Sequence, residues 1–411
     1  SLKSCTALNC TIPNVSKFDR KHYFYPDLPK GYQISQYDEP FGQNGFLVIG
    51  DREIRINRLH LEEDAAKLLH PEGAPYSIVD YNRGGTPLME IVTEPDIENP
   101  RVAGKFLREL RAMMRVLDVS DANMEKGEMR VEANISVSTT AEKGTKVEVK
   151  NLNSFRSVER AIRYEVKRQC ELLEKGEKVV QETRGWDEEK QQTFSQRLKE
   201  ASHDYRYFPD PDVPKLLISK IEAFAEEKLH ATIPELPWEK RGRYKKDFGF
   251  NEDITELYVG DPALGDFFEQ VAECFGEDMK KIKLASNYIT SDLRGLMGQN
   301  REFKITPSAF ADIVNMVIEG VFSSRSAKRT LELIYAHNEK GSPREIAQRH
   351  DLFQQSNEEA LQIVVQKVIR EHQSIAEEYK RGKTSALQFL VGQGMKVTGG
   401  SANPTALREI L

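Results

Sequence analysis

Three glutamates in the first third of the 411-residue chain have the chemistry to bind a metal ion beside phosphate groups. Glu90 interrupts an otherwise apolar run, and Glu63 and Glu132 lie in two further stretches that alternate apolar and polar residues. Mg²⁺ prefers hard oxygen ligands from carboxylates, water and substrate phosphates. If these stretches are strands of one curved sheet, the residues predict a carboxylate cluster that holds Mg²⁺ against the phosphates of a nucleotide.

The alternation around Glu63 predicts which side chains point the same way. After a reset of the register at Arg58, it places Glu63 on an apolar face and three polar residues on the opposite face: His60, Glu62 and Asp64. An inward carboxylate must be paired, protonated or bound to a metal. A plain ion pair of Glu90 with Arg83 or a lysine is therefore an open alternative, and Glu132 has simple solvent exposure as its alternative.

Two loops and two further arginines could contact phosphate. A Gly84–Gly85 pair lets a ligand approach the backbone closely. The loop at 151–154 either caps an expected helix at 158–174 or binds an anion at the N-terminus of that helix. Arginines pair with phosphates or with carboxylates. The candidates are Arg83, Asn151, Asn153, Ser154, Arg184 and Arg206. The sequence has neither a P-loop motif nor a kinase-type glycine-rich loop, which excludes both of those enzyme classes.

The elements that must position these residues change in type along the chain. Strand patterns at 17–58, 178–184 and 193–197 alternate with an amphipathic helix at 99–117, and prolines near 232–238 end this mixed region. Almost everything after that reads as helix. We therefore predict an α+β fold with a mainly antiparallel first domain at 1–236, a helical domain at 237–350 and a small helical tail domain at 351–411.

The composition excludes several classes of protein. Charged residues make up 30% and hydrophobic residues 39%, and no apolar run is long enough to span a bilayer. The four cysteines lack C-x-x-C spacing, so we expect reduced thiols in a cytoplasmic protein and no zinc site. The net charge of −6 argues against a general nucleic-acid coat. Local basic clusters either bind RNA or are solvated helix faces: Lys328, Arg329, Lys380, Arg381 and Lys383.

Six motifs identify a family. They are YFYPDLPKGYQISQ at 23–36, LHLEED at 59–64, VDYNRGGTPLMEIV at 79–92, KNLNSF at 150–155, DYRYFPD at 204–210 and TIPELP at 232–237. In this collinear order, the chain resembles the B subunit of the bacterial aspartyl/glutamyl-tRNA(Asn/Gln) amidotransferase. The resemblance covers essentially the whole chain.

The resemblance implies a fold and a reaction. The first domain would be a cradle of the glutamine-synthetase type that binds ATP and Mg²⁺. It would phosphorylate the side-chain carboxylate of Glu-tRNA(Gln) or Asp-tRNA(Asn), and ammonia would then displace the phosphate to give the amide. Glu63, Glu90 and Glu132 would be the catalytic residues and metal ligands. Relatives carry an upstream Glu-x-His segment with further ligands, so we expect the metal site of the present residues to be incomplete.

The resemblance also implies partners. An amidase A subunit would release ammonia from glutamine, and Lys21, Lys30 and Glu63 would line the route of ammonia into this subunit. A small C subunit would complete a heterotrimer. The tail would bind tRNA(Gln) or tRNA(Asn), and the non-discriminating aminoacyl-tRNA synthetase is a further expected partner. Two alternatives stay open: a non-catalytic tRNA-binding and docking module, and a stand-alone ATP-dependent carboxylate–amine ligase.

Overall fold

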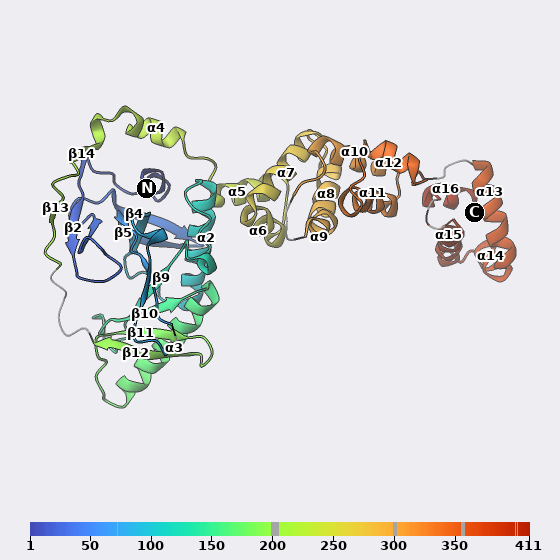
Figure 1. The fold of residues 1–411 in the computed structure, drawn as a ribbon. Helices are drawn as coiled ribbons and strands as arrows, with labels where there is room; N and C mark the ends of the chain where they lie inside the picture. Colours follow the sequence, from blue (N-terminus) through green and yellow to red (C-terminus); the bar gives the residue numbers. More distant parts are fainter. Residues whose placement is uncertain (72, 199–204, 299–301, 355–357, 399, 401) are drawn as a thin grey trace. The chain divides into compact units, whose positions relative to one another are not determined.

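The computed structural model describes residues 1–411 except 72, 199–204, 299–301, 355–357, 399 and 401. The chain divides into two compact units, Ser1–Lys240 and Arg241–Leu411 (Figure 1). The first unit mixes helices with small, mostly antiparallel sheets, and the second is helical. The predicted combination of helices with mainly antiparallel sheets is found. The glutamine-synthetase-type cradle and the boundaries at 236/237 and 350/351 stay predictions.

Strands of the first unit form three main sheets. Two have three antiparallel strands each: β4 (Gly42–Ile49), β5 (Arg52–Glu63) and β8 (Pro87–Thr93) in one, and β13 (Phe208–Pro209), β2 (Asp19–His22) and β3 (Tyr32–Ser35) in the other. The third has the order β12 (Gln192–Leu198), β11 (Glu182–Asp187), β10 (Val147–Leu152) and β9 (Val131–Ile135), with β10 and β11 parallel. Two small ladders pair β1 (Val15–Ser16) with β14 (Leu216–Leu217), and β6 (Lys67–Leu69) with β7 (Ile78–Asp80).

In the first unit, the first three helices pack against these sheets, and the fourth packs against the first. They are α1 (Leu2–Ala7), α2 (Pro100–Val116), α3 (Phe155–Glu174) and α4 (Glu226–Ala231), with 3₁₀ turns η1 (Tyr81–Arg83), η2 (Met124–Lys126), η3 (Ile218–Lys220) and η4 (Glu222–Phe224). Asn99 caps α2 by accepting a hydrogen bond from the backbone N–H of Val102, and Pro100 occupies the first turn. One hydrophobic core joins residues of α1, α2 and α3 to residues of β4, β5, β9 and β10.

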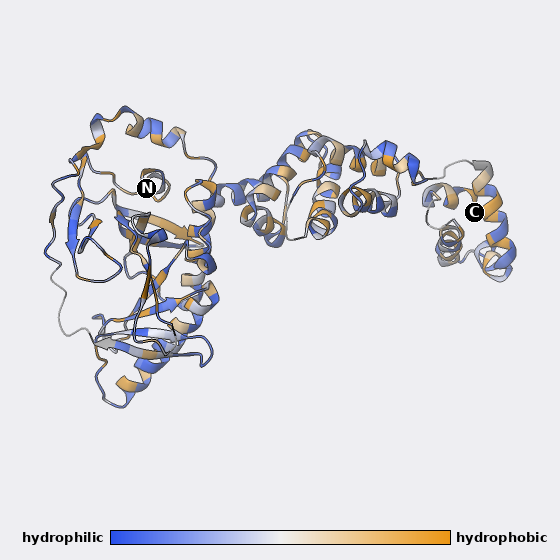
Figure 2. Cartoon of the chain, in the orientation of Figure 1, coloured by the Kyte–Doolittle hydropathy of each residue, from blue (hydrophilic) through white to orange (hydrophobic). Residues whose placement is uncertain are grey.

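Amphipathic helices build the second unit, and Figure 2 shows hydrophobic and hydrophilic residues side by side along them. Helix α5 (Pro237–Asp247) spans the division between the units. It is followed by α6 (Glu252–Gly260), α7 (Pro262–Glu273), α8 (Met279–Tyr288), the π-helical η5 (Ile289–Leu293), α9 (Arg294–Met297), α10 (Pro307–Ile318), α11 (Ser324–Ala336) and α12 (Pro343–Arg349). These helices share one core. Within the described parts of the chain, none of the helices combines the length and apolar content that crossing a membrane would require.

The tail of the second unit has its own small cores. It consists of α13 (Glu358–Glu371), α14 (Gln373–Lys380), α15 (Ser385–Val397) and α16 (Pro404–Ile410). Leu361, Val365 and Leu407 belong to one buried cluster, and Val368 and Leu390 belong to another.

A substitution of Gly45 in β4 tests how closely the first unit is packed around this strand. A Cβ at this position would lie 2.4 Å from the Cys10 Sγ and 2.6 Å from the Leu8 carbonyl oxygen. Because backbone cannot yield as easily as a side chain, we expect Gly45→Ala to destabilise this unit by roughly 1–3 kcal/mol. The two tryptophans, Trp186 and Trp238, both lie in the first unit, so urea unfolding followed by their fluorescence measures the effect.

Gly242→Ala is the matched control, because a Cβ on this helical glycine of α5 meets no atom within 4 Å. We expect it not to destabilise the tryptophan-detected transition, because alanine favours a helix more than glycine does. Equal stability of Gly45→Ala and the wild type would contradict the packing described for β4.

Candidate active site

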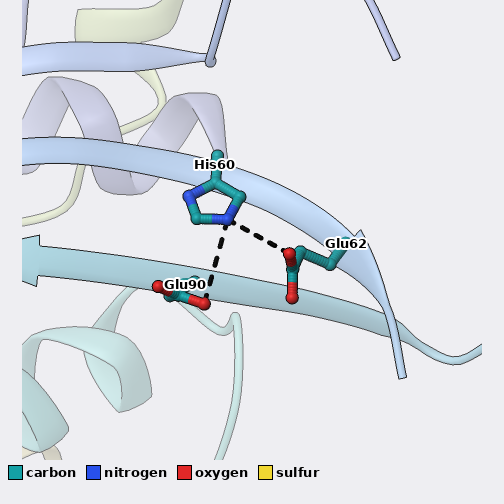
Figure 3. Close-up of side chains that lie close together, drawn as sticks. All are labelled: His60, Glu62 and Glu90. Atoms are coloured by element: carbon teal, nitrogen blue, oxygen red, sulfur yellow. Dashed lines mark ion pairs between the residues drawn. The ribbon is translucent and has the colours of Figure 1, made fainter. Parts of the chain in front are cut away.

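The register between β5 and β8 brings three chemically active side chains onto one face of their sheet. His60 lies directly opposite Glu90, and Glu62 lies opposite Leu88. Because side chains alternate along a strand, His60 and Glu62 project to the same side of β5, toward the side chain of Glu90. Figure 3 shows the His60 ring directed at both carboxylates.

The three side chains form a tight group. The His60 Nε2 lies 3.4 Å from the Glu62 Oε1 and 3.9 Å from the Glu90 Oε2. The side chains of His60 and Glu62 are buried, whereas that of Glu90 is 46% exposed. Across the described residues, this is the single group of at least three His, Cys, Asp or Glu side chains whose ligand atoms lie within 4.8 Å of one another. The group is therefore open to solvent on the side of Glu90.

Glu62 is held as a carboxylate by several partners. It accepts hydrogen bonds from the Ser35 hydroxyl at 2.6 Å and from the Gln33 amide at 3.2 Å, and the Lys21 Nζ lies 3.5 Å away. Burial favours the neutral acid, but the contacts with His60, Lys21 and Ser35 outweigh it and lower the pKa of Glu62 to about 2. Glu62 is thus charged at any physiological pH.

Two carboxylates with an imidazole behind them fit a magnesium ion. Mg²⁺ is usually held by one or two carboxylates together with water and substrate phosphates, and Glu62 and Glu90 can supply these carboxylates from neighbouring strands. A nitrogen ligand is less suited to Mg²⁺, so His60 fits better as the hydrogen-bond partner that orients Glu62. The exposed side of Glu90 leaves room for phosphate oxygens.

Glu63 lies on the other side of β5. Its carboxylate bonds to the Lys30 Nζ at 2.5 and 2.7 Å and accepts a hydrogen bond from the backbone N–H of Ile34 at 2.9 Å. The predicted reset at Arg58 is confirmed by a shift in the β5–β8 register between Ile56 and Arg58. The expectation that Glu63 meets Glu90 is wrong in geometry, because the pairing with β8 turns Glu90 toward the face of His60 and Glu62.

Glu132 belongs to a different sheet from Glu90. It lies on β9, its side chain is 49% exposed, and it forms an ion pair with the Lys150 Nζ at 2.9 Å. The expected single curved sheet that carries all three glutamates is not found, because β5 and β8 pair with β4, whereas β9 pairs with β10. Within the described residues, Glu132 is not part of the group around His60.

Arg83 and the 151–154 loop have local partners. The Arg83 Nε lies 3.0 Å from the Asp64 Oδ2, so the alternative of a Glu90–Arg83 pair is not found. Ser154 caps α3 by accepting a hydrogen bond from the backbone N–H of Ser157. Asn151 has a left-handed backbone, with a φ of 64°, and donates a hydrogen bond to the Trp186 carbonyl at 3.1 Å, while Asn153 donates to Asn151 at 3.4 Å. Ser154 is thus a helix cap, and anion binding by the loop stays a prediction.

The remaining arginine candidates differ in their surroundings. Arg184 donates to the Glu182 carboxylate at 2.5 Å and to the Thr193 hydroxyl at 2.8 Å, and its Nε lies 3.6 Å from the fully buried Glu165. Arg184 therefore pairs with Glu182 of β11 and Glu165 of α3, and neither of these is one of the three predicted glutamates. Arg206 is exposed and has a left-handed backbone, with a φ of 44°.

Most basic residues of the helical clusters have acidic neighbours. The Lys328 Nζ lies 2.9 Å from the Asp292 carboxylate, and Arg329 pairs with Glu332 at 2.7 Å. In the tail, Arg381 lies 3.6 Å from Glu377 and Lys383 lies 2.7 Å from Glu378, whereas Lys380 ends helix α14. Pairs on exposed helix faces hold their partners weakly, so these cations are not locked in place.

Sequence reasoning missed Glu62 and His60 as members of the site, although the signal was present. The alternation places them together on one face, and a His-x-Glu spacing on a strand puts both side chains on the same side. The alternation within one strand does not predict the register of pairing with β8, which the structure shows.

Metal binding distinguishes Glu62 from Glu63. We expect Mn²⁺ and Mg²⁺ to bind the wild-type chain and the Glu63→Gln variant alike, because Glu63 lies outside the group, and to bind Glu62→Gln and Glu90→Gln at least tenfold more weakly. Isothermal titration calorimetry measures the affinity. A thermal shift gives a second readout, since a ligand at 100 times its Kd stabilises by about 2.7 kcal/mol. Loss of binding in Glu63→Gln with retention in Glu62→Gln would contradict this assignment.

Family models and relatives that share one name match this chain from its first residue to its last. Residues 1–223 match the family model described as the GatB/GatE catalytic domain, and residues 266–411 match the model described as the GatB domain. Proteins named as the B subunit of aspartyl/glutamyl-tRNA(Asn/Gln) amidotransferase align with all of this chain. Those from Caldanaerobacter subterraneus subsp. tengcongensis and Persephonella marina are 43% identical over 86% and 87% of their own lengths. That from Rickettsia felis is 44% identical over 85% of its length. The chain therefore belongs to the GatB family, the B subunits of aspartyl/glutamyl-tRNA(Asn/Gln) amidotransferases.

Proposed function

We propose that this chain uses ATP to activate the side-chain carboxylate of Glu-tRNA(Gln), Asp-tRNA(Asn) or both, and that ammonia then converts the activated group to the amide. Membership of the GatB family and the names of its relatives support this reaction. A carboxylate is a poor acceptor of ammonia because its oxygen leaves badly, whereas phosphorylation turns that oxygen into a good leaving group. The products are Gln-tRNA(Gln) and Asn-tRNA(Asn).

The observation that carries the proposal is the group formed by Glu62, Glu90 and His60. In the proposed reaction, Glu62 and Glu90 hold Mg²⁺ at the phosphates of ATP. The ion neutralises phosphate charge when it is bound. His60 and Lys21 keep Glu62 ionised and fix its direction, which prepares the site before substrate arrives. Glu132 remains a predicted further ligand from the third sheet.

The residues predicted to contact phosphate differ in how far their hydrogen-bond donors are already used within the protein. Arg83 is the last residue of the 3₁₀ turn η1, next to Gly84, and is half-exposed, so its guanidinium can exchange part of its contact with Asp64 for a phosphate. The loop of Asn151, Asn153 and Ser154 remains a predicted contact. Arg184 enters the proposal as a residue that stabilises the third sheet, because its donors are already used there. Arg206 remains a predicted phosphate contact.

Ammonia and partners complete the proposal. The ammonia route along Lys21, Lys30 and Glu63 remains a prediction, in which Lys21 pairs with Glu62 and Lys30 pairs with Glu63. An amidase A subunit would supply the ammonia, a small C subunit would complete the complex, and a non-discriminating synthetase would supply the charged tRNA. The same proposal places the protein in the cytoplasm.

Amide formation by the assembled complex tests the proposed site. With ATP, Mg²⁺, ammonium and Glu-tRNA(Gln), we expect Glu62→Ala and Glu90→Ala to lower kcat by about 100-fold, because each removes one proposed ligand of the ion. Glu53→Ala is a control on the same strand β5, in an exposed position outside the group. Unchanged amide formation by Glu62→Ala and Glu90→Ala would overturn the site.

The same assay separates the two alternatives. A non-catalytic docking module predicts that variants of this chain change tRNA binding while ATP cleavage in the complex is unaffected. A stand-alone ligase predicts that free glutamate competes with Glu-tRNA(Gln) as acceptor. Neither result is expected if aminoacyl-tRNA is activated at Glu62 and Glu90.

The tail's basic cluster tests the RNA contact. We expect replacement of Lys380, Arg381 and Lys383 by alanine to weaken tRNA binding and to reduce the salt dependence of binding by about one unit of slope for each lost phosphate contact. Lys167→Ala on α3 is the control, because Lys167 is an exposed helical lysine outside the tail. Filter binding over a range of salt concentrations measures both effects. Identical slopes for the triple variant and the wild type would leave the cluster as a solvated helix face.

A further inference from the structure

Four tyrosines form a continuous row of rings that starts at the proposed active site. The centroid of the Tyr23 ring lies 6.1 Å from that of Tyr205, and Tyr205 lies 6.0 Å from Tyr207, both in edge-to-face contact. Tyr207 stacks on Tyr37 with centroids 4.5 Å apart and ring planes inclined by 16°. Aromatic rings in these geometries stabilise one another beyond simple burial.

Lys21 links the row to Glu62. The Lys21 Nζ is 3.5 Å from the Glu62 Oε1 and 5.2 Å from the centroid of the Tyr205 ring. Burial and the negative charges of Glu62 and Glu90 raise the pKa of Tyr207, which keeps its phenol neutral.

The outer end of the row is open to solvent. Tyr37 is 63% exposed although its ring is stacked on Tyr207. Its backbone N–H donates to the buried carboxylate of Asp19 at 3.2 Å, which fixes the start of its loop to strand β2. The backbone N–H of His22, also on β2, donates to the Tyr205 carbonyl at 2.9 Å. The segments that carry Tyr37 and Tyr205 are therefore both hydrogen-bonded to strand β2. The Tyr37 ring is held in place while part of its surface stays exposed.

A row of packed rings with a lysine beside one of them has the chemistry that binds single-stranded nucleic acid. Bases of any sequence stack on aromatic side chains, and a nearby cation attracts the phosphate between them. The proposed substrate presents such a segment, because the amino acid is esterified to the single-stranded 3′ end of tRNA. If the side-chain carboxylate reacts at Glu62 and Glu90, the terminal nucleotides must lie next to these residues.

We propose that the row of Tyr23, Tyr205, Tyr207 and Tyr37 is the platform on which the 3′-terminal nucleotides of the aminoacyl-tRNA stack, with Tyr37 as the outermost contact. The inference rests on the proposed function and names the residues that hold the substrate end. Tyr37 is a positioning residue, since it would contact the nucleotides and not the reacting carboxylate. It would contribute to the affinity for charged tRNA and not to the affinity for ATP.

The experiment compares tRNA(Gln) with and without its single-stranded 3′ nucleotides, bound to the assembled complex. We expect Tyr37→Ala and Tyr37→Leu to raise the Kd of the intact tRNA about tenfold and to leave the Kd of the truncated tRNA unchanged, because only the intact RNA can stack there. Tyr37→Phe keeps the ring and should bind like the wild type. Tyr76→Ala, a change of an equally exposed tyrosine elsewhere in the first unit, is the matched control.

Kinetics with Glu-tRNA(Gln) give a second readout. We expect Tyr37→Ala to raise KM for Glu-tRNA(Gln) about tenfold, with KM for ATP unchanged. An increase in KM for ATP would assign the row to the nucleotide's adenine and overturn the inference, as would equal weakening of intact and truncated tRNA. If the wild-type complex binds tRNA in this way but forms no amide, the proposed function fails while the platform stands. Wild-type binding by Tyr37→Ala to intact tRNA overturns the platform alone.

Discussion

The pairing of β5 with β8 is the constraint on which the first unit depends. It sets His60 opposite Glu90 and turns Glu62 to the same face, so two carboxylates share one imidazole. A buried carboxylate beside a second one is costly unless it is well solvated by the protein. The neighbouring sheet provides that compensation through Lys21 of β2 and through Gln33 and Ser35 of β3.

The second sheet thus serves two purposes. Strand β2 supplies Lys21 to the carboxylate group on one hand, and on the other it anchors the tyrosine row through Asp19 and His22. Gln36, just after β3, accepts a hydrogen bond from the backbone N–H of Leu61 at 3.0 Å, which fixes the two sheets to each other at the site. The charged group and the proposed platform for RNA bases are therefore held in a fixed relation by one set of strands.

The sequence predicted local structure well and long-range pairing poorly. The alternation at 54–64 separated Glu62 from Glu63 and located the break at Arg58, because side-chain period is a property of a single strand. Whether Glu62 or Glu63 lies beside Glu90 depends on the pairing with β8, a strand about thirty residues further along the chain. The alternation within β5 contains no information on this pairing, so the prediction of Glu63 was wrong. Arg184 likewise meets Glu165 of α3, a contact that no local pattern contains. The family, by contrast, followed from motifs spread along the chain.

The most direct test of the account is a crystal structure of the complex with Mn²⁺ and a non-hydrolysable ATP analogue, because the anomalous scattering of Mn²⁺ locates the ion without assumptions. The account predicts an anomalous peak in contact with carboxylate oxygens of Glu62 and Glu90 and with phosphate oxygens of the nucleotide. A peak at Glu63 or Glu132, with Glu62 and Glu90 contacting neither ion nor nucleotide, would contradict it.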